Sequence, residues 1–407
     1  MAAILPHLAQ PGETTKLEKE YWRCSSSGLE GPSVLCPTPQ QVVDQSHANL
    51  LTIAWTRKVI LEQLAGAIIT PKYDGDDVIL AIDKSPAGPL WNPLAERGKT
   101  SLLTWTSKMG APSFSMAAGS TFIGGSCPAA AAGQSVVPNK EREKVAETLV
   151  DVLGIKEVQL ANAICQYCYA MGGRYPAASA QFDGLVRYAW AKHAIEVDYK
   201  GKRVSPGSEN CLFVGVMIEA IENAEFYIEG KYVKEKKTGR LREDIAPEPP
   251  QWRAQRFFRL HDSGDMFAPS YLKAWKNIAN HFREKDRIVF WAPSRIWALG
   301  PTWLNHVRNI NGEPKEAQNN LVIRPSGYHV DQHGVDCLTE EDGWAACTVV
   351  YRHEKAKEAQ HRTFDWDCKA YSVEGGPNCR RAENPDGITG CRTCWMRPDL
   401  RVNYTLH

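Results

Sequence analysis

The chain has 407 residues, 43% of them hydrophobic, with 13 tryptophans, 14 tyrosines and 11 phenylalanines. This composition excludes a disordered scaffold, and the length suits one large α/β domain with appendages or two or three smaller domains. Its 48 basic and 47 acidic residues nearly balance, so no global field draws the chain to DNA or a membrane. No apolar run approaches the roughly 20 residues that span a bilayer, and the start lacks a secretory pattern. We therefore expect a cytoplasmic protein without a membrane partner.

Residues 1–105 are predicted to form an N-terminal extension. Residues 1–37 are rich in Gly, Ser and Pro, and residues 41–69 carry apolar side chains at helical spacing. Residues 70–112 mix Pro and Gly with short apolar stretches, which predicts turns and short strands. A strand-like segment at 113–122 follows, and helices are predicted over 141–153, 177–197 and 211–224. Residues 229–250 form a charged, hairpin-like segment and a Pro-rich loop.

After residue 255 short apolar strands alternate with helices. Strands are predicted at 257–260, 288–291, 321–323 and 348–351, and a helix with a good apolar stripe starts near Pro269. This alternation predicts an α/β core over residues 106–355 with a parallel sheet. A complete or partial (β/α) barrel is the first expectation, and a doubly wound sheet is the alternative. Residues 356–407 are predicted to be a Cys-rich metal-binding tail.

The twelve cysteines argue for metal binding, because a large chain without a secretory signal seldom uses a disulfide framework. Cys165 and Cys168 form a CxxC motif with Tyr167 between them, and Cys127 lies upstream with 37 residues between it and Cys165. Three converging thiolates can hold a [4Fe–4S] cluster with one open iron, which S-adenosylmethionine (SAM) can chelate. A zinc half-site and a redox dithiol are the alternatives. The usual radical-SAM spacing, CxxxCxxC, is absent here.

A second group of cysteines lies near the end of the chain. Cys368, Cys379, Cys391 and Cys394 fall in a segment rich in Gly, Asn and Pro, which cannot bury much apolar surface by itself. A metal centre is therefore expected to stabilise it, either zinc or a second [4Fe–4S] cluster. Cys24, Cys36, Cys211, Cys337 and Cys347 have no close partner in sequence and are expected to be mostly buried apolar residues.

Polar residues follow three of the predicted strands. The first strand leads into His261, Asp262, Ser263, Gly264 and Asp265. In a barrel the carboxyl ends of the strands carry the chemistry, so His261, Asp262 and Asp265 are candidate catalytic residues. Ser263, Gly264 and Tyr167 are candidate cofactor-binding residues. A helix N-cap at Asp265 or Ser270 is the structural alternative.

Two arginines follow the next predicted strands. Arg295 and Arg324 each come directly after a strand, so both are expected at the same rim as candidate cofactor-binding residues. Each could equally be an ordinary surface arginine.

Three stretches resemble the phage gene-product-88 family: residues 107–115 (SKMGAPSFS), Cys127–Pro128 with 165–170 (CQYCYA), and 261–265 (HDSGD). Some members of that family also have a Cys-rich tail ending in CxxCW, as residues 391–395 (CRTCW) do here. The resemblance covers roughly residues 105–407 with gaps. It implies a divergent radical-SAM-like fold with a cluster at Cys127, Cys165 and Cys168. The chain departs from the family pattern at Ala117, and the first two of these cysteines are unusually far apart.

The resemblance implies a fold and a cofactor more than a reaction. The first function hypothesis is a radical-SAM enzyme, which in a phage setting would be an isomerase acting on a hypermodified thymidine or other nucleobase in DNA, supplied with electrons by a reductant protein. The host cytoplasm would be its location. A zinc-stabilised, non-radical enzyme acting on nucleic acid is the second hypothesis. The third is a non-catalytic nucleic-acid-binding protein that uses the basic segment 231–242, and its affinity would fall steeply with salt.

Overall fold

The computed structural model describes most of the chain beyond residue 38. It covers residues 39–84, 98–106, 109–134, 137, 139–153, 163–168, 170, 175, 177–224, 256–285, 288–312, 319–331, 335, 338–351, 364–372, 379, 382–387 and 390–404. Cys24, Cys36, Cys337, the charged segment 229–250 and the side chain of Tyr167 lie outside this description.

An eight-stranded sheet organises the molecule, in the order β10-β11-β9-β8-β7-β6-β5-β4. Its strands are β4 (Thr104–Thr106), β5 (Ala111–Phe114), β6 (Arg256–Leu260), β7 (Ile288–Ser294), β8 (Leu321–Val330), β9 (Thr348–Val350), β10 (Trp366–Asp367) and β11 (Val402–Asn403). All neighbours pair in parallel except β4 with β5. The α/β class with a parallel sheet is thus confirmed.

The strand order bears on the barrel prediction. From β5 to β9 the strands are adjacent in chain order, without the reversal that defines a doubly wound sheet. Among the described residues the sheet is open, with β4 and β10 at its edges, so the complete barrel is not what this part of the chain forms. Seven α-helices are described, together with short 3-10 helices.

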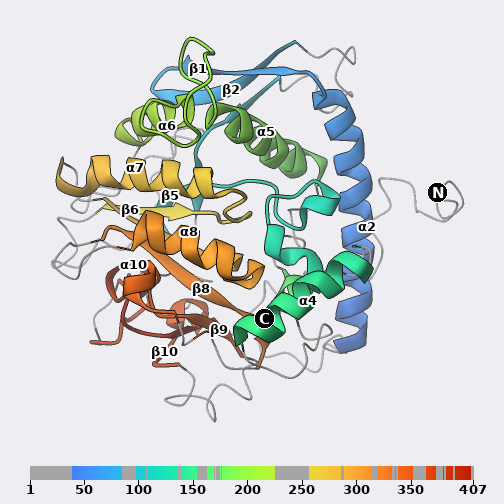
Figure 1. Ribbon diagram of the computed structural model, residues 1–407, viewed down its shortest axis with the longest axis vertical. Helices are drawn as coiled ribbons and strands as arrows, with labels where there is room; N and C mark the ends of the chain where they lie inside the picture. The colour runs from blue at the N-terminus through green and yellow to red at the C-terminus, as the bar shows by residue number, and fades with distance from the viewer. Residues whose placement is uncertain are drawn as a thin grey trace, which may run out of the picture.

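Helices α7 (Pro269–Lys285) and α8 (Pro301–Asn311) lie over one face of the sheet (Figure 1). Side chains alternate between the two faces of a strand. Phe258, Phe290 and Ile323 belong to the main core, which also holds Trp275 and Ile278 of α7. This burial explains why the strands are short apolar runs and why α7 carries a clear apolar stripe.

The Cys-rich tail covers the other face. Phe257, Trp291 and Val322 point to that side and pack with Trp395 of α10 (Thr393–Met396). The Trp395 indole Nε1 donates to the Phe258 carbonyl at 3.0 Å. The tail also contributes β10 and β11 to the sheet, so it is a layer of the core rather than a separate appendage.

The N-terminal region also packs on this core. Helix α2 (Pro39–Leu64) runs along one side of the molecule, and α5 (Ala178–Ala194) lies against it (Figure 1). A three-stranded antiparallel sheet follows α2, and the predicted boundary at residue 105 falls within β4. Its strands are β1 (Ile68–Asp74), β2 (Asp77–Lys84) and β3 (Lys99–Ser101).

The crossover from β5 to β6 is long and holds most of the remaining helices. These are η1 (Thr121–Ile123), η2 (Pro128–Gly133), α4 (Asn139–Leu153), η4 (Ile164–Tyr167), α5 and α6 (Leu212–Glu222). Three further 3-10 helices follow later strands: η7 (Ile296–Leu299), η8 (Glu340–Asp342) and η9 (Lys369–Ser372). None of the described helices has both the length and the apolar character needed to cross a bilayer.

Candidate functional site

The carboxyl ends of β5 and β6 are joined by hydrogen bonds beyond the strands themselves. The His261 N–H donates to the Phe114 carbonyl at 2.9 Å, and the Met116 N–H donates to the Ser263 carbonyl at 2.9 Å. The Ser263 hydroxyl returns a bond to the Met116 carbonyl at 2.7 Å. The predicted strand over 113–122 therefore ends at Phe114, and its continuation forms a loop tied to residues 261–265.

Gly264 brings this turn against the loop that carries Cys127. Its φ is +98°, and a Cβ there would stand 2.6 Å from the Ser126 Oγ. Only glycine has both the backbone freedom and the absence of a side chain that this contact requires. The 261–265 turn and Cys127 are thus packed together through Ser126.

Asp265 connects β6 to the end of β7. Its carboxylate accepts from the Ser294 hydroxyl at 2.6 Å, the Arg295 N–H at 2.9 Å and the Met266 N–H at 2.7 Å. Burial raises the pKa of this carboxyl, and the three donors oppose that rise. A helix N-cap role does not explain all the contacts of Asp265, because two of its three hydrogen-bond donors, Ser294 and Arg295, lie at the end of β7.

The three thiols of the first cluster share one neighbourhood. Burial raises the pKa of Cys127 well above its ordinary value, and Asp265, Cys168 and Cys165 add to the rise. Burial also raises the pKa of Cys165, to about 11, against the opposing effect of Arg295. Cys127 and Cys168 belong to the same apolar cluster. The structure therefore brings the distant Cys127 back to the CxxC pair.

Arg295 faces this group of thiols. Burial lowers its pKa, but the charges of Cys165, Cys168, Asp265 and Cys127 outweigh burial and raise the pKa overall. Its Nε donates to the Gly327 carbonyl at 3.0 Å, which fixes the guanidinium between the ends of β7 and β8. The predicted position of Arg295 at the rim agrees with this geometry.

Sequence reasoning missed Arg57 of α2. It is 1% exposed and stands at helical spacing within the buried stripe of Leu50, Ile53, Ile60 and Leu64. Burial lowers its pKa to about 10, while Cys127 and Cys168 act to raise it. A cation in the middle of an apolar helix face is the signal that could have identified it.

Asp262 lies beside the thiol site. Its Oδ1 is 2.9 Å from the Arg259 Nη1, and its Oδ2 accepts from the Tyr175 hydroxyl at 2.7 Å. Tyr175 packs in the apolar cluster that includes Cys127 and Cys168. Asp262 thus forms a structural link between β6 and Tyr175, which packs near Cys127 and Cys168.

His261 departs from the predicted orientation. We expected it to face SAM or substrate, but it is 3% exposed and its ring stacks on Tyr271 of α7. Its Nε2 lies 3.0 Å from the Tyr271 hydroxyl. Burial, with a contribution from Arg259, lowers the pKa of His261 to about 3, so the imidazole is neutral at pH 7.

Arg324 also departs from its predicted place at the rim. It is fully buried, and its guanidinium binds backbone carbonyls of the tail region. Nε donates to Cys394, Nη1 to Ala346 and Leu400, and Nη2 to Thr393 and Arg397. These five acceptors use all five donors of the side chain. The strand predicted to end at residue 323 continues as β8 for six residues beyond Arg324. Arg324 therefore lies within the strand and not at its carboxyl edge.

The tail cysteines lie in and beside the apolar core between the sheet and the tail, which contains Trp291 and Trp395. Cys379 and Cys394 are buried there, and Cys368 packs against it. The Cys394 Sγ is 3.0 Å from the Tyr404 hydroxyl, and the Cys391 Sγ is 3.2 Å from the Thr393 hydroxyl. Within the described residues, no three His, Cys, Asp or Glu side chains are grouped as ligands of a single metal ion. The predicted metal centres at Cys127, Cys165 and Cys168 and in the tail therefore both stay predictions.

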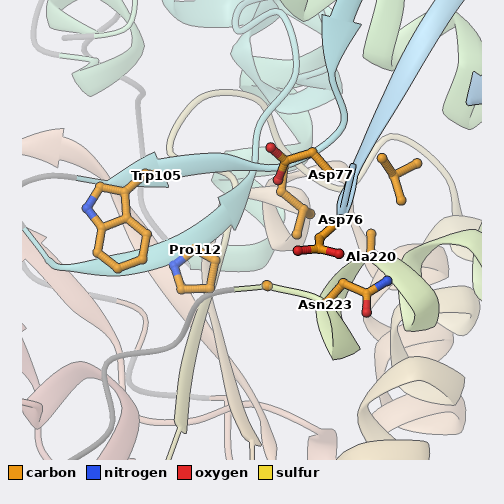
Figure 2. Close-up of a pocket in the computed structure, with 9 residues that line it drawn as sticks. Asp76, Asp77, Trp105, Pro112, Ala220 and Asn223 are labelled. Atoms are coloured by element: carbon orange, nitrogen blue, oxygen red, sulfur yellow. The ribbon is translucent and has the colours of Figure 1, made fainter. Parts of the chain in front are cut away.

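A pocket lies at the other end of β5, away from the thiols. Figure 2 shows Trp105 and Pro112 on adjoining strands, with Asp76 of the β1–β2 turn and Asp77 at the start of β2 near Asn223. None of the predicted site residues lines this pocket. The chemistry-bearing residues and the pocket are therefore separate features.

Residues 223–397 match the family model described as Gene product 88. The match confirms the predicted resemblance to that phage family over this segment, which includes residues 261–265, Arg295 and the tail cysteines. Cys127, Cys165, Cys168 and Arg57 lie before it. No curated protein and no solved structure matches the chain.

Proposed function

We propose that the chain is a radical-SAM-type iron–sulfur enzyme in which Cys127, Cys165 and Cys168 hold a [4Fe–4S] cluster. The observation that carries this proposal is the shared neighbourhood of these three thiols with Asp265 and Arg295, at the carboxyl ends of sequentially ordered parallel strands. Ligands of α/β sheets bind at that edge. A sheet of this order also suits a partial barrel.

The charges of the site fit a dicationic group bound by three thiolates. Arg57 and Arg295 are cations, and Asp265 is the carboxylate among them. Three protonated thiols would leave this buried set with a net positive charge, which is unfavourable in a low-dielectric interior. Three thiolates around a dication bring the set to neutrality. Both an oxidised [4Fe–4S] core and Zn²⁺ satisfy this balance.

A zinc ion and a [4Fe–4S] cluster make different demands on the positions of three thiolates. A zinc ion draws its ligands to about 2.3 Å for sulfur, so its thiolates lie close together. In a cluster each thiolate binds a different iron, and the sulfurs stand further apart. Among the described residues no three His, Cys, Asp or Glu side chains are grouped to hold a single metal ion, so iron, sulfide and zinc analysis decides between the two groups.

The residues of this chain have definite tasks around such a cluster. A cluster held by Cys127, Cys165 and Cys168 would supply the electron for reductive cleavage of SAM. Asp265 orients Arg295 through the backbone N–H of that residue and through Ser294. The Arg295 guanidinium can hold the carboxylate of SAM. Asp262, held by Arg259 and Tyr175, is the second acceptor group at this edge. His261 packs on Tyr271 of α7 and supports the 261–265 turn through that contact.

The substrate we propose is a modified nucleobase in phage DNA, with isomerisation as the reaction. The match to a phage family supports a phage setting. A reductant protein must deliver the electrons, and cytoplasmic conditions would keep the thiols reduced. We propose a second metal group, a cluster or zinc, at Cys368, Cys379, Cys391 and Cys394. A zinc-stabilised, non-radical enzyme on the same nucleic acid is the alternative.

Anaerobic purification with iron and sulfide analysis, followed by a SAM-cleavage assay, tests the proposal. We expect about four irons and four sulfides at the first site, in line with a [4Fe–4S] cluster, and dithionite-dependent formation of 5′-deoxyadenosine. The Cys165→Ala and Cys168→Ala variants should lose both, and Cys211→Ala, which changes a buried thiol at the start of α6, should keep both. A colourless wild-type protein that carries only zinc would contradict it.

A further inference from the structure

Helix α2 packs directly on the thiol site. Leu50 and Ile53 of this helix belong to the same apolar cluster as Cys127 and Cys168. The helix also contacts η1, which comes shortly before Cys127, and η4, which ends just before Cys168. The N-terminal region therefore forms one wall of the site, although the family match begins only at residue 223.

Arg57 projects from this wall and is only partly satisfied. Its Nε donates to the Gln181 Oε1 at 2.6 Å, and its Nη1 donates to the Ile123 carbonyl at 3.2 Å. Its Nη2 is buried and has no hydrogen-bond partner, and none of the ion pairs among the described residues involves Arg57. A guanidinium removed from water without an anion destabilises the folded protein, because its desolvation is not compensated.

We propose that Arg57 is a positioning residue of the thiol site, whose Nη2 donates to a sulfur acceptor of the net-anionic complex that the bound group forms with Cys127, Cys165 and Cys168. This inference rests on the proposed metal group at those thiols. Gln181 of α5 and the Ile123 carbonyl hold the guanidinium through Nε and Nη1, which leaves the buried Nη2 as the donor available to a bound group. Arg295 also interacts with these thiols, so two cations from distant parts of the chain lie near the proposed group.

Arg187 of α5 offers a matched control. It is also buried, its Nε donates to the Ser101 carbonyl at 2.9 Å, and its Nη1 donates to the Ser115 carbonyl at 3.1 Å. Burial lowers its pKa to about 10, as for Arg57, but its charge partner is Asp183 rather than a cysteine. A variant of Arg187 therefore loses a similar buried guanidinium without touching the thiol site.

The test compares full-length protein before and after reconstitution with iron and sulfide, under anaerobic conditions. The measured quantity is the rise in melting temperature on loading, because a bound group stabilises only the state that binds it. We expect Arg57→Gln to keep less than half of the wild-type rise. Arg187→Gln should lower both melting temperatures equally and keep the full rise. An unchanged rise in Arg57→Gln, or an equal loss in Arg187→Gln, overturns the inference.

A second variant covers the case in which Arg57→Gln does not fold. Arg57→Lys keeps the charge but lacks the Nη2 donor, and we expect it to release iron to a chelator several-fold faster than wild type. Arg187→Lys should release iron at the wild-type rate, and equal rates for the two variants overturn the inference. If wild type binds zinc but no cluster, the proposed function fails while the same comparison with zinc still decides the role of Arg57. Wild-type protein that binds neither overturns both.

Discussion

His261 is the most constrained side chain of the 261–265 turn. Its φ of +60° is rare for a residue other than glycine, and its imidazole is enclosed between the sheet and Tyr271. Nδ1 is buried without a hydrogen-bond partner, so protonating the ring would add a charge where no acceptor receives it. The residue therefore acts as a neutral support for the residues that follow it.

This neutrality predicts a pH dependence of stability. The pKa of His261 is lowered from 6.5 to about 3 in the folded protein, so the unfolded chain takes up a proton first as the pH falls. Its contribution to stability is complete above pH 6.5 and is lost as the pH falls toward 3, by up to ~1.4 kcal/mol per pH unit. We expect His261→Asn, which tolerates a positive φ, to show a shallower decline between pH 6.5 and 5 in urea unfolding. Parallel pH profiles for both proteins would contradict this role.

At the scale of elements, the turn after β6 is coupled to the Cys127 loop through one glycine. A side chain at Gly264 would displace the Ser126 hydroxyl, which donates to the Ala117 carbonyl at 2.9 Å. We expect Gly264→Ala to destabilise the protein by ~2–3 kcal/mol in urea unfolding and to reduce iron uptake. Gly201, with φ +73° and no atom within 4 Å of its added Cβ, is the control. Gly201→Ala should lose ~1 kcal/mol and no iron, and equal effects would contradict the coupling.

The tail layer depends on Arg324 more than on any surface ion pair. Arg324→Met would leave five carbonyls around residues 346 and 393–400 without their donor. We expect a loss of at least ~3 kcal/mol and faster proteolysis near the tail. Arg308, whose Nε lies 3.8 Å from Asp342 and which is 62% exposed, gives the comparison. Arg308→Met should change stability by less than ~0.5 kcal/mol, and a similar loss in both variants would exclude a special role for Arg324.

The elements that periodicity identifies were predictable, and those set by tertiary contacts were not. The stripes of α4, α5 and α7 and the apolar runs of β6 and β7 are local signals, and their predicted positions agree with the structure to within a few residues. The strand predicted to Phe122 ends at Phe114, because backbone groups after it bond to the 261–265 turn. The tail strands β10 and β11 span two residues each, which is too short for any alternation to appear.

The candidate site divides in the same way. Asp265 and Arg295 were predictable because residues after buried strands meet at one edge. The enclosure of His261 by Tyr271, and the use of Arg324 by the tail, depend on which element covers each face of the sheet. That choice is made by contacts between residues far apart in sequence, such as the hydrogen bond from Trp395 to the Phe258 carbonyl. Arg57 was overlooked for the same reason, because α2 was treated as an extension.

At the scale of the whole molecule, the two cysteine groups lie in different layers. The first packs with α2 in the apolar cluster of Leu50 and Ile53, and the second belongs to the core between the sheet and the tail. The Tyr404 hydroxyl, whose pKa is raised by burial and then by Cys394 and Cys368, lies among the tail thiols and not among the first group. If each group holds metal, each should bind it independently.

This separation predicts additive metal contents. The variant with Cys127, Cys165 and Cys168 all changed to Ala should lose the first metal group and SAM cleavage but keep the metal of the tail. Changing Cys391 and Cys394 to Ala should remove the tail metal and lower stability by several kcal/mol, on the order of a structural metal site, because α10 holds the carbonyls that bind Arg324. Iron, zinc and sulfide per chain, measured on both variants after anaerobic reconstitution, give the result. Loss of all metal from either variant would show that the chain binds one shared group.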